Sequence, residues 1–165
     1  MDAITVQDSR IYSIVVLYDM HTDFFKKALD GISDEDAHKR LETEANHIAW
    51  LTGSLVQQRF EIAGLLGHDK RPKSDSLFNN FQGIKSDVTY PPLSQFLSDW
   101  NQITPVLREQ LCKLTPQQSD YILDLGGMKM SRFDFISFST YREANCIGQI
   151  ALWRRLLGYP AFRYD

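Results

Sequence analysis

The sequence predicts an all-α protein: a bundle of four long helices, with a short additional helix and a long connection between the second and third long helices. Three observations lead to this prediction. Four segments repeat apolar residues at intervals of three and four, the spacing of a helix with one buried side. No stretch alternates apolar and polar residues over more than a few positions, so strands are not expected. The four segments are also similar in length, which suits lateral packing.

The first two helices are delimited by glycines. The first is expected over about residues 8–30, where one apolar stripe ends at Gly31. The SDED sequence at 33–36 then offers a cap for a short turn. The second is expected over about residues 42–66 and closes at Gly67. Because it is apolar around most of its circumference, it should lie centrally in the fold.

The other two long helices are bounded by prolines and glycine. The third is expected over about residues 93–114, and Pro105 should kink it or mark its true start. The TPQQSDYIL sequence at 115–123 begins with a Thr-Pro cap signal and predicts the short additional helix. The fourth is expected over about residues 132–157, and Gly158 stops it.

The connection over residues 67–92 is long for a compact domain, and its DSLFNNFQG sequence predicts one short helix. Two interpretations stay open. The connection is either a flap over one end of the bundle or a plain crossover that joins parallel helices.

Composition limits the class of protein. The chain has 165 residues, of which 43% are hydrophobic and 24% charged, which is typical of one globular domain spanning residues 1–165. The net charge of −3 gives no footprint for nucleic acid. The most basic stretch, HDKRPK at 68–73, contains Asp69 and is expected to be a solvated loop.

Cysteine use and the absence of targeting signals predict a cytoplasmic protein. Cys112 and Cys146 have no CxxC spacing, so reduced thiols are expected. The first ten residues are polar and acidic and do not resemble an export signal. No apolar run approaches the roughly 20 residues that cross a bilayer, so no membrane partner is expected.

Catalytic motifs are few. The chain has no P-loop, GxGxxG, HExxH or GxSxG sequence, and its four histidines show no metal-ligand spacing. His21 falls on the apolar stripe of the first helix. It is either a hydrogen-bonded core residue or a ligand. His47 is either a helix-start residue or a base that shares a helix face with Ser54. Whether the protein is an enzyme stays open.

The last helix places an arginine and a cysteine among apolar side chains. Steps of three and four trace one face: Phe135, Phe138, Arg142, Cys146, Gln149, Trp153 and Leu156. A buried arginine needs a carboxylate or several acceptors, and Glu44 or Asp23 is a candidate partner. Cys146, one turn below the guanidinium, is either a thiolate with a lowered pKa or a small buried thiol beside a structural ion pair.

Two sequences resemble the DinB-like (DinB/YfiT-type) superfamily. The last helix, YREANCIGQIALWRRLLGYP, is similar to a helix in which a His-x-x-x-His pair precedes GQ and an RR-LLG-P ending. NHIAWLTGSLVQQRF at 46–60 is similar to a second helix with a Trp-x-x-Gly-His-Leu pattern. The resemblance covers essentially the whole chain and implies an up-down-down-up four-helix bundle. It also implies a homodimer and, in many members, a divalent metal used for thiol transfer.

The residues at the family's ligand positions do not suit a metal. The helix-two histidine falls on Ser54, and the helix-four histidines fall on Arg142 and Cys146. A serine hydroxyl is a poor ligand for zinc or nickel, and a guanidinium repels the ion. The resemblance therefore implies a degenerate metal site, and no cofactor is predicted unless this residue-by-residue assignment is misplaced.

Two functions remain. The first is a non-catalytic or metal-independent homodimer that binds a small anionic molecule, with Arg142, Ser54 and Gln149 around the anion. The second is a thiol-dependent transferase or hydrolase-like enzyme in the same pocket, with Cys146 as nucleophile and His21 or His47 as base. A divalent metal bound atypically by Cys146 and His47 is a variant of the second.

Overall fold

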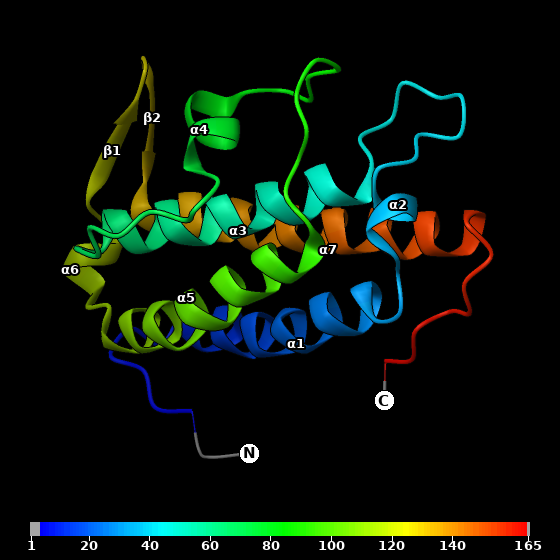
Figure 1. Ribbon diagram of the computed structural model, residues 1–165. Coiled ribbons are helices and arrows are strands. Elements are labelled where there is room, and N and C mark those ends of the chain that lie inside the picture. Colours follow the sequence, from blue (N-terminus) through cyan, green and yellow to red (C-terminus); the bar gives the residue numbers. More distant parts are fainter. Residues whose placement is uncertain (1–3, 165) are drawn as a thin grey trace.

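The computed structural model describes residues 4–164 and is mostly helical, with one two-stranded antiparallel sheet. Four long helices lie side by side (Figure 1), namely α1 (Ile11–Leu29), α3 (Ile48–Leu65), α5 (Leu93–Lys113) and α7 (Arg132–Leu156). Both α1 and α3 pack against α5 and α7. In Figure 1, α1 and α7 run in one direction and α3 and α5 in the opposite direction. The prediction of a predominantly helical chain is confirmed.

Helix α3 begins later than predicted, at Ile48. Residues 40–47 form turns, and Leu41 and Glu42 have positive φ angles of 45° and 59°. The start is set by His47, whose Nδ1 accepts a hydrogen bond from the backbone N–H of Trp50 at 3.1 Å. His47 is therefore an N-cap, which is the helix-start role considered for it.

Two smaller predictions at helix ends can be settled. Pro105 lies inside a continuous α5 and on its exposed side, so it does not mark the start of that helix. The short helix α6 (Pro116–Ser119) forms as predicted. Its capping box joins Thr115 and Gln118, each of which accepts a hydrogen bond from the backbone N–H of the other.

A β-hairpin corrects the expectation that the chain has no strands. Strands β1 (Ile122–Leu125) and β2 (Met128–Ser131) pair through Gly126 and Gly127, whose φ angles are 71° and 101°. A two-residue turn with both φ angles positive is the one that fits the twist of a hairpin. The strands carry little apolar alternation because Ile122 and Met128 are exposed and only Leu123 is buried.

The connection between α3 and α5 is ordered by two short helices. It contains α4 (Asp75–Phe78) and the 3-10 helix η1 (Asn79–Phe81), and another short helix, α2 (Asp34–Ala37), follows α1. Figure 1 shows that the connection joins two helices that run in the same direction, as a crossover does. It also packs on α3, so it forms a wall of the molecule as well as a link.

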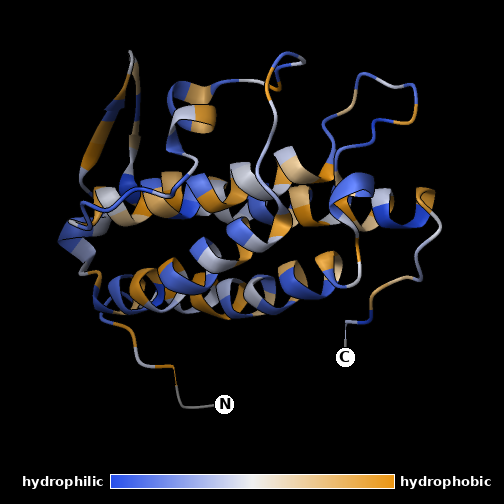
Figure 2. Cartoon of the chain, viewed as in Figure 1, coloured by the Kyte–Doolittle hydropathy of each residue, from blue (hydrophilic) through white to orange (hydrophobic). Residues whose placement is uncertain are grey.

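The core lies between the four long helices. Trp100 and Phe25 stack there with ring centroids 3.8 Å apart, and Phe60 and Phe96 are also fully buried. Figure 2 shows apolar residues interspersed with polar ones along all four helices, and the structure determines which of them face inward. Within residues 4–164, none of the helices combines the length and the apolar character that crossing a membrane requires.

The buried face of α7 differs from the one predicted. Phe138, Gln149 and Leu156 are exposed, although the predicted stripe placed them inside. The side chains that face the core are instead Ile136, Ser139, Glu143, Cys146, Ile147, Ile150, Trp153 and Arg154. Cys146 and Trp153 belong to both sets, so the period of the helix was predicted correctly and the direction of its buried face only in part.

Candidate functional site

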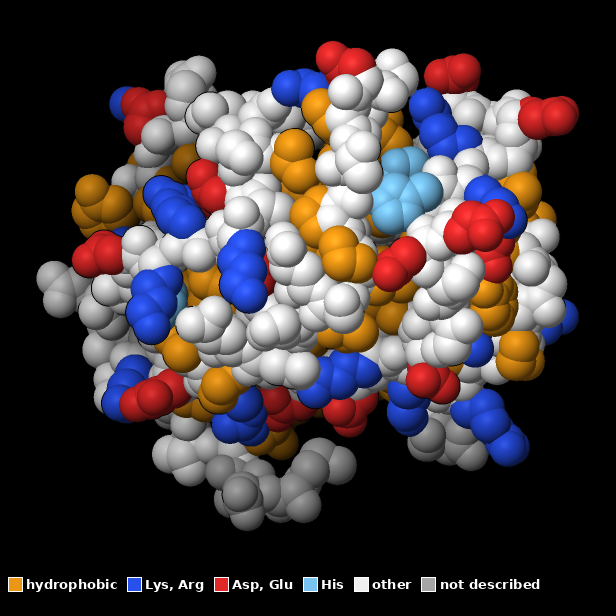
Figure 3. Space-filling model, viewed as in Figure 1, with side chains coloured by type: hydrophobic (Ala, Val, Ile, Leu, Met, Phe, Trp, Pro, Cys, Tyr) orange, Lys and Arg blue, Asp and Glu red, His pale blue; other side chains and the backbone are white. Residues whose placement is uncertain are grey.

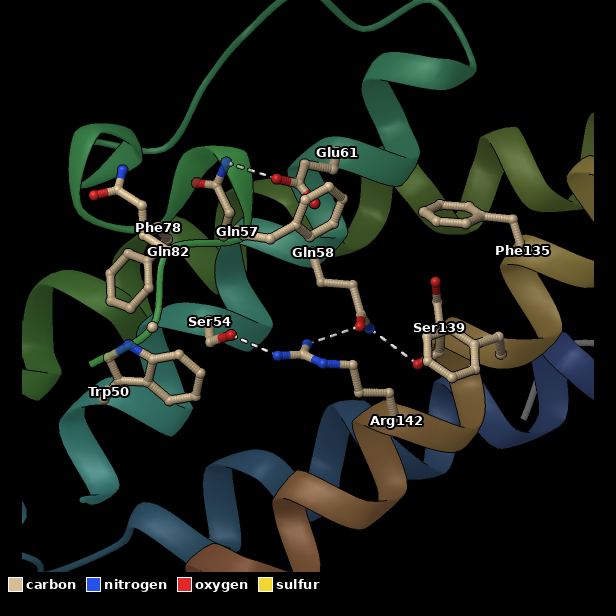
Figure 4. Close-up of a pocket in the computed structure, with 13 residues that line it drawn as sticks. Trp50, Ser54, Gln57, Gln58, Glu61, Phe78, Gln82, Phe135, Ser139 and Arg142 are labelled. Carbon is tan, nitrogen blue, oxygen red and sulfur yellow. Dashed lines mark hydrogen bonds between the residues drawn. The ribbon is translucent and has the colours of Figure 1, made fainter. Parts of the chain in front are cut away.

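A pocket of about 380 Å³ lies between α3, α7 and the crossover. Figure 4 shows Arg142 of α7 reaching toward Ser54 and Gln58 of α3, with Phe78 and Gln82 of the crossover lying beside Gln57. Its walls combine aromatic rings with amide, hydroxyl and charged groups: Trp50, Ser54, Gln57, Gln58, Glu61, Phe78, Phe81, Gln82, Gly83, Phe135, Phe138, Ser139 and Arg142. Such a mixture of apolar walls and a few polar groups is typical of small-molecule sites.

Arg142 provides the positive charge of this pocket. Its Nη2 donates to Ser54 Oγ at 2.6 Å and its Nη1 to Gln58 Oε1 at 2.9 Å (Figure 4). Gln58 is held in turn, because its Nε2 donates to the backbone carbonyl of Ser139 at 2.9 Å. The guanidinium is thus oriented by neutral groups and keeps its full charge, with N–H donors to spare.

The carboxylate partner expected for Arg142 is absent. Glu44 and Asp23 are exposed, and no carboxylate in the described part of the chain lies within ion-pair distance of this guanidinium. Arg142 is half-buried on the pocket wall, which agrees with the expectation that it lies at least partly inside, but its expected partner was wrong. Neutral acceptors are enough to stabilise the Arg142 guanidinium there, because the half-buried group is also solvated by water.

Cys146 and Gln149 do not join Arg142 at the pocket. Burial raises the pKa of the Cys146 thiol, and the nearby charge of Arg142 offsets this only in part. Of the two interpretations of Cys146, the buried thiol agrees with the structure and the thiolate with a lowered pKa does not, and the residue lies outside the pocket lining. Gln149 is exposed and donates to Asn145 at 2.7 Å.

The crossover wall of the pocket depends on Gly53. A Cβ at that position would lie 2.5 Å from Phe78 Cε2 and 2.7 Å from Phe96 Cε1, closer than side chains pack. The absence of a side chain lets the Phe78 ring rest directly on α3, where it is buried. Next to it, Phe81 lines the pocket mouth with 85% of its surface exposed and a positive φ of 57°. An aromatic residue held in this conformation carries local strain.

A buried ion pair is present, but Arg59 and Glu143 form it, and Arg142 takes no part in it. Arg59, with no exposed surface, donates to both carboxylate oxygens of Glu143, with Nε–Oε2 at 2.9 Å and Nη2–Oε1 at 2.6 Å. Its Nη1 donates to the hydroxyls of Thr22 and Thr104. The guanidinium also lies over the Trp100 ring, 3.4 Å from the centroid. This cluster ties together α1, α3, α5 and α7.

Burial by itself raises the pKa of Glu143, but the charge and hydrogen bonds of Arg59 outweigh this effect. The pKa is therefore held below its usual value and the carboxylate stays ionised. His21 belongs to the same cluster, with its Nδ1 3.4 Å from Glu143 Oε1. This buried position corresponds to the core role considered for His21, away from the pocket.

Sequence reasoning missed Arg59 and Glu143, although one signal was present. Gln57, Gln58 and Arg59 interrupt a helix that is otherwise apolar on nearly every side. Three consecutive polar residues span most of a helical turn, so at least one of them must point inward. A buried arginine on the second helix requires a buried carboxylate elsewhere.

His47 does not line the pocket and lies beside two other ring side chains. Its ring lies 5.3 Å from the rings of His38 and Tyr90. Burial, and then the charges of His38 and Arg40, lower the pKa of His47 to about 4. It is neutral near pH 7, as its capping hydrogen bond requires, and it does not face Ser54 or Cys146 across the pocket.

The three residues that the DinB-like resemblance assigns to ligand positions do not fit a metal ion. Arg142 is a cation that donates a hydrogen bond to Ser54, and Cys146 holds a thiol with a raised pKa. In residues 4–164, no three side chains of His, Cys, Asp or Glu come together as a metal site. A search against protein-family models and curated proteins finds no match to this chain.

Proposed function

We propose that this protein binds a small organic anion in the pocket beside Arg142, without a metal and without catalysis by the chain. One observation carries the proposal: the Arg142 guanidinium is fixed at a pocket wall by Ser54 and Gln58, which leave its charge uncompensated. An oriented guanidinium binds a planar carboxylate through two parallel hydrogen bonds. The aromatic walls suit an apolar or aromatic body attached to that carboxylate.

We further propose that the scaffold is a DinB-like four-helix bundle with a degenerate metal site. The directions of the four long helices in Figure 1 agree with an up-down-down-up arrangement. Ser54 and Arg142, which the resemblance places at ligand positions, face each other from α3 and α7 and are in contact. In this interpretation a fixed positive charge on the chain has replaced the positive charge of the ion.

The thiol-dependent alternative has less support. A nucleophilic cysteine works as a thiolate and must reach the substrate. Cys146 is buried, its pKa is raised by that burial, and it does not line the pocket. Neither His21 nor His47 lines the pocket either, so this constellation lacks both its nucleophile and its base at the proposed binding site.

We also propose that two copies of the chain associate through α7. Between Tyr141 and Leu152, the exposed residues of this helix are all uncharged: Tyr141, Ala144, Asn145, Gly148, Gln149 and Leu152. The adjoining helix α1 exposes Leu17 and Met20. A solvated helix face normally carries charges, so an uncharged face with large apolar residues favours a partner surface. A second copy supplies the same surface by two-fold symmetry.

The proposed anion site is tested by thermal unfolding with sodium benzoate, a planar carboxylate on an aromatic ring. Binding at one hundred times Kd stabilises a protein by about 2.7 kcal/mol, which raises Tm by roughly 5–10 °C at this chain length. We expect benzoate to stabilise the native protein, and Arg142→Met to fold normally while losing this stabilisation. Arg155→Met, which removes an exposed arginine from the same helix, should keep it.

Sodium chloride at equal ionic strength separates specific binding from screening. If benzoate has no greater effect than chloride on the native protein, or if Arg142→Met is stabilised as strongly as the native chain, the proposed function is wrong. Titration followed by backbone NMR shifts would locate the bound benzoate, with the largest shifts expected around Ser54 and Gln58.

A further inference from the structure

The pocket has a second polar end, on the crossover side of α3. Gln57 is only 3% exposed, and its Nε2 donates to Glu61 Oε1 at 3.1 Å and to Asp75 Oδ1 at 2.9 Å. Both partners are carboxylates, so the amide must present its nitrogen to them, and its orientation is fixed. The Gln57 Oε1 acceptor that remains is buried and has no hydrogen-bond partner among the described residues.

Glu61 adds a carboxylate with no cation of its own. No lysine, arginine or histidine within residues 4–164 lies within ion-pair distance of it, and its only hydrogen bond in the structure comes from Gln57. Burial has the largest effect on the pKa of Glu61 and raises it, while the Gln57 hydrogen bond and the more distant charges of Arg142 and Arg71 lower it less strongly. A half-buried carboxylate in this condition is stabilised by a cationic group that enters the pocket.

The two ends of the pocket are therefore opposite in charge, and they form no direct ion pair with each other. Arg142 is bonded to Ser54 and Gln58, and Glu61 is bonded to Gln57, although all line one cavity. Figure 4 shows Arg142 extending from α7 to Ser54 and Gln58, while Gln57 and Glu61 lie next to each other in the upper part of the view. A simple anion would satisfy the first end and leave the second without a partner.

We infer that the natural ligand is a zwitterion with an apolar or aromatic body, whose carboxylate binds Arg142 and whose ammonium group binds Glu61 and Gln57 Oε1. This inference rests on the proposed function and adds the second group of the ligand. An ammonium offers three N–H donors, enough for the Glu61 carboxylate and for the unpartnered amide oxygen. Phe135, Phe138 and Trp50 would contact the body of the ligand.

The spacing of the two ends indicates how far apart the ligand's charges are. Gln58 and Glu61 are three residues apart on α3, a rise of about 4.5 Å along the helix. Their side chains extend in different directions, toward Arg142 and toward Gln57 respectively. A ligand whose carboxylate and ammonium are separated by several bonds or by a ring therefore suits the two ends.

Three probes of similar shape test the inference in the native protein by calorimetric titration: 4-(aminomethyl)benzoate, with both charges; 4-methylbenzoate, with the carboxylate alone; and benzylamine, with the ammonium alone. We expect the zwitterion to bind at least tenfold more tightly than 4-methylbenzoate, and benzylamine to bind most weakly. This comparison needs no variant, so it does not depend on how a substitution affects folding.

Variants then assign the preference to Glu61. In Glu61→Gln, which preserves shape and the hydrogen bond with Gln57, the two carboxylate probes should bind equally. In Glu109→Gln, which neutralises an exposed carboxylate on α5, the tenfold difference should persist. In Arg142→Met, both carboxylate probes should lose affinity.

The outcomes separate this inference from the proposed function. Equal binding of the zwitterion and 4-methylbenzoate to the native protein would refute the ammonium subsite and leave the anion pocket standing. Tightest binding by benzylamine would overturn the zwitterion as well, because the pocket would then select a cation. If neither carboxylate probe binds, the proposed function fails together with the inference.

Discussion

Two glycines of helix α3 allow a matched test of how the pocket wall is built. Gly53 supports the Phe78 ring of the crossover, whereas a Cβ added at Gly64 would meet nothing within 4 Å. We predict that Gly53→Ala destabilises the protein and weakens ligand binding in the pocket. Gly64→Ala, the same substitution in the same helix, should stabilise the protein and leave binding unchanged.

The magnitudes follow from opposing effects at each position. Alanine is favoured over glycine within a helix by about 0.5–1 kcal/mol, which applies to both variants. At Gly53 the new Cβ would lie 2.5 Å from one atom of Phe78 and 2.7 Å from one atom of Phe96, so at least one ring must move. Loss of Phe78 burial costs about 1.5–3 kcal/mol. We therefore expect a net loss of about 1–2 kcal/mol for Gly53→Ala.

Urea unfolding followed by circular dichroism measures both changes. With an m-value of roughly 2 kcal/mol per molar urea, the midpoint should fall by about 0.5–1 M for Gly53→Ala and rise slightly for Gly64→Ala. Titration with 4-methylbenzoate should show weaker binding only for Gly53→Ala, because Phe78 lines the pocket. Equal midpoints and equal affinities in the two variants would refute the role assigned to the Gly53–Phe78 contact.

Three further predictions concern stability, its pH dependence and assembly. Glu143→Gln leaves the fully buried Arg59 without its counter-charge and should cost about 3–5 kcal/mol in urea unfolding, and a loss below about 1 kcal/mol would contradict the role of the pair. Arg59 holds the pKa of Glu143 in the folded protein below its usual value of 4.5, so the free energy of unfolding should decrease as the pH is lowered below that value. Glu143→Gln should show a weaker pH dependence. By sedimentation equilibrium, the native chain should have the mass of a dimer and Leu152→Glu that of a monomer, with Ile122→Glu in the hairpin as control; a native monomer at all concentrations would exclude the proposed homodimer.

Charges of both signs are mixed on the face of the molecule that Figure 3 presents. Figure 3 shows basic and acidic side chains interspersed on the face it presents, with apolar atoms visible around the crossover. Specificity in this protein therefore has to come from individually positioned charges such as Arg142 and Glu61. Both side chains are half-buried on the pocket wall, where solvent screens a charge less than it does on an exposed surface.

The sequence alone determined the helical class and three of the four long helices to within a few residues. Apolar periodicity and glycine or proline stops act locally, so they can be read without knowledge of the fold. The start of α3 was misjudged because its cap is the unusual residue His47. The hairpin was missed because Gly126 and Gly127 are a turn signal whose flanking strands are mostly exposed.

The sequence also identified Ser54 and Arg142, through the pattern of residues around them. It could not identify their partners, because Gln58, Gln57 and Glu61 become pocket residues only when α7 and the crossover pack against α3. The same limit explains Arg59 and Glu143, which are 84 positions apart and pair because two helices meet. Helical period is a property of neighbouring residues, whereas the direction of a buried face and the partner of a buried charge are decided by tertiary contacts.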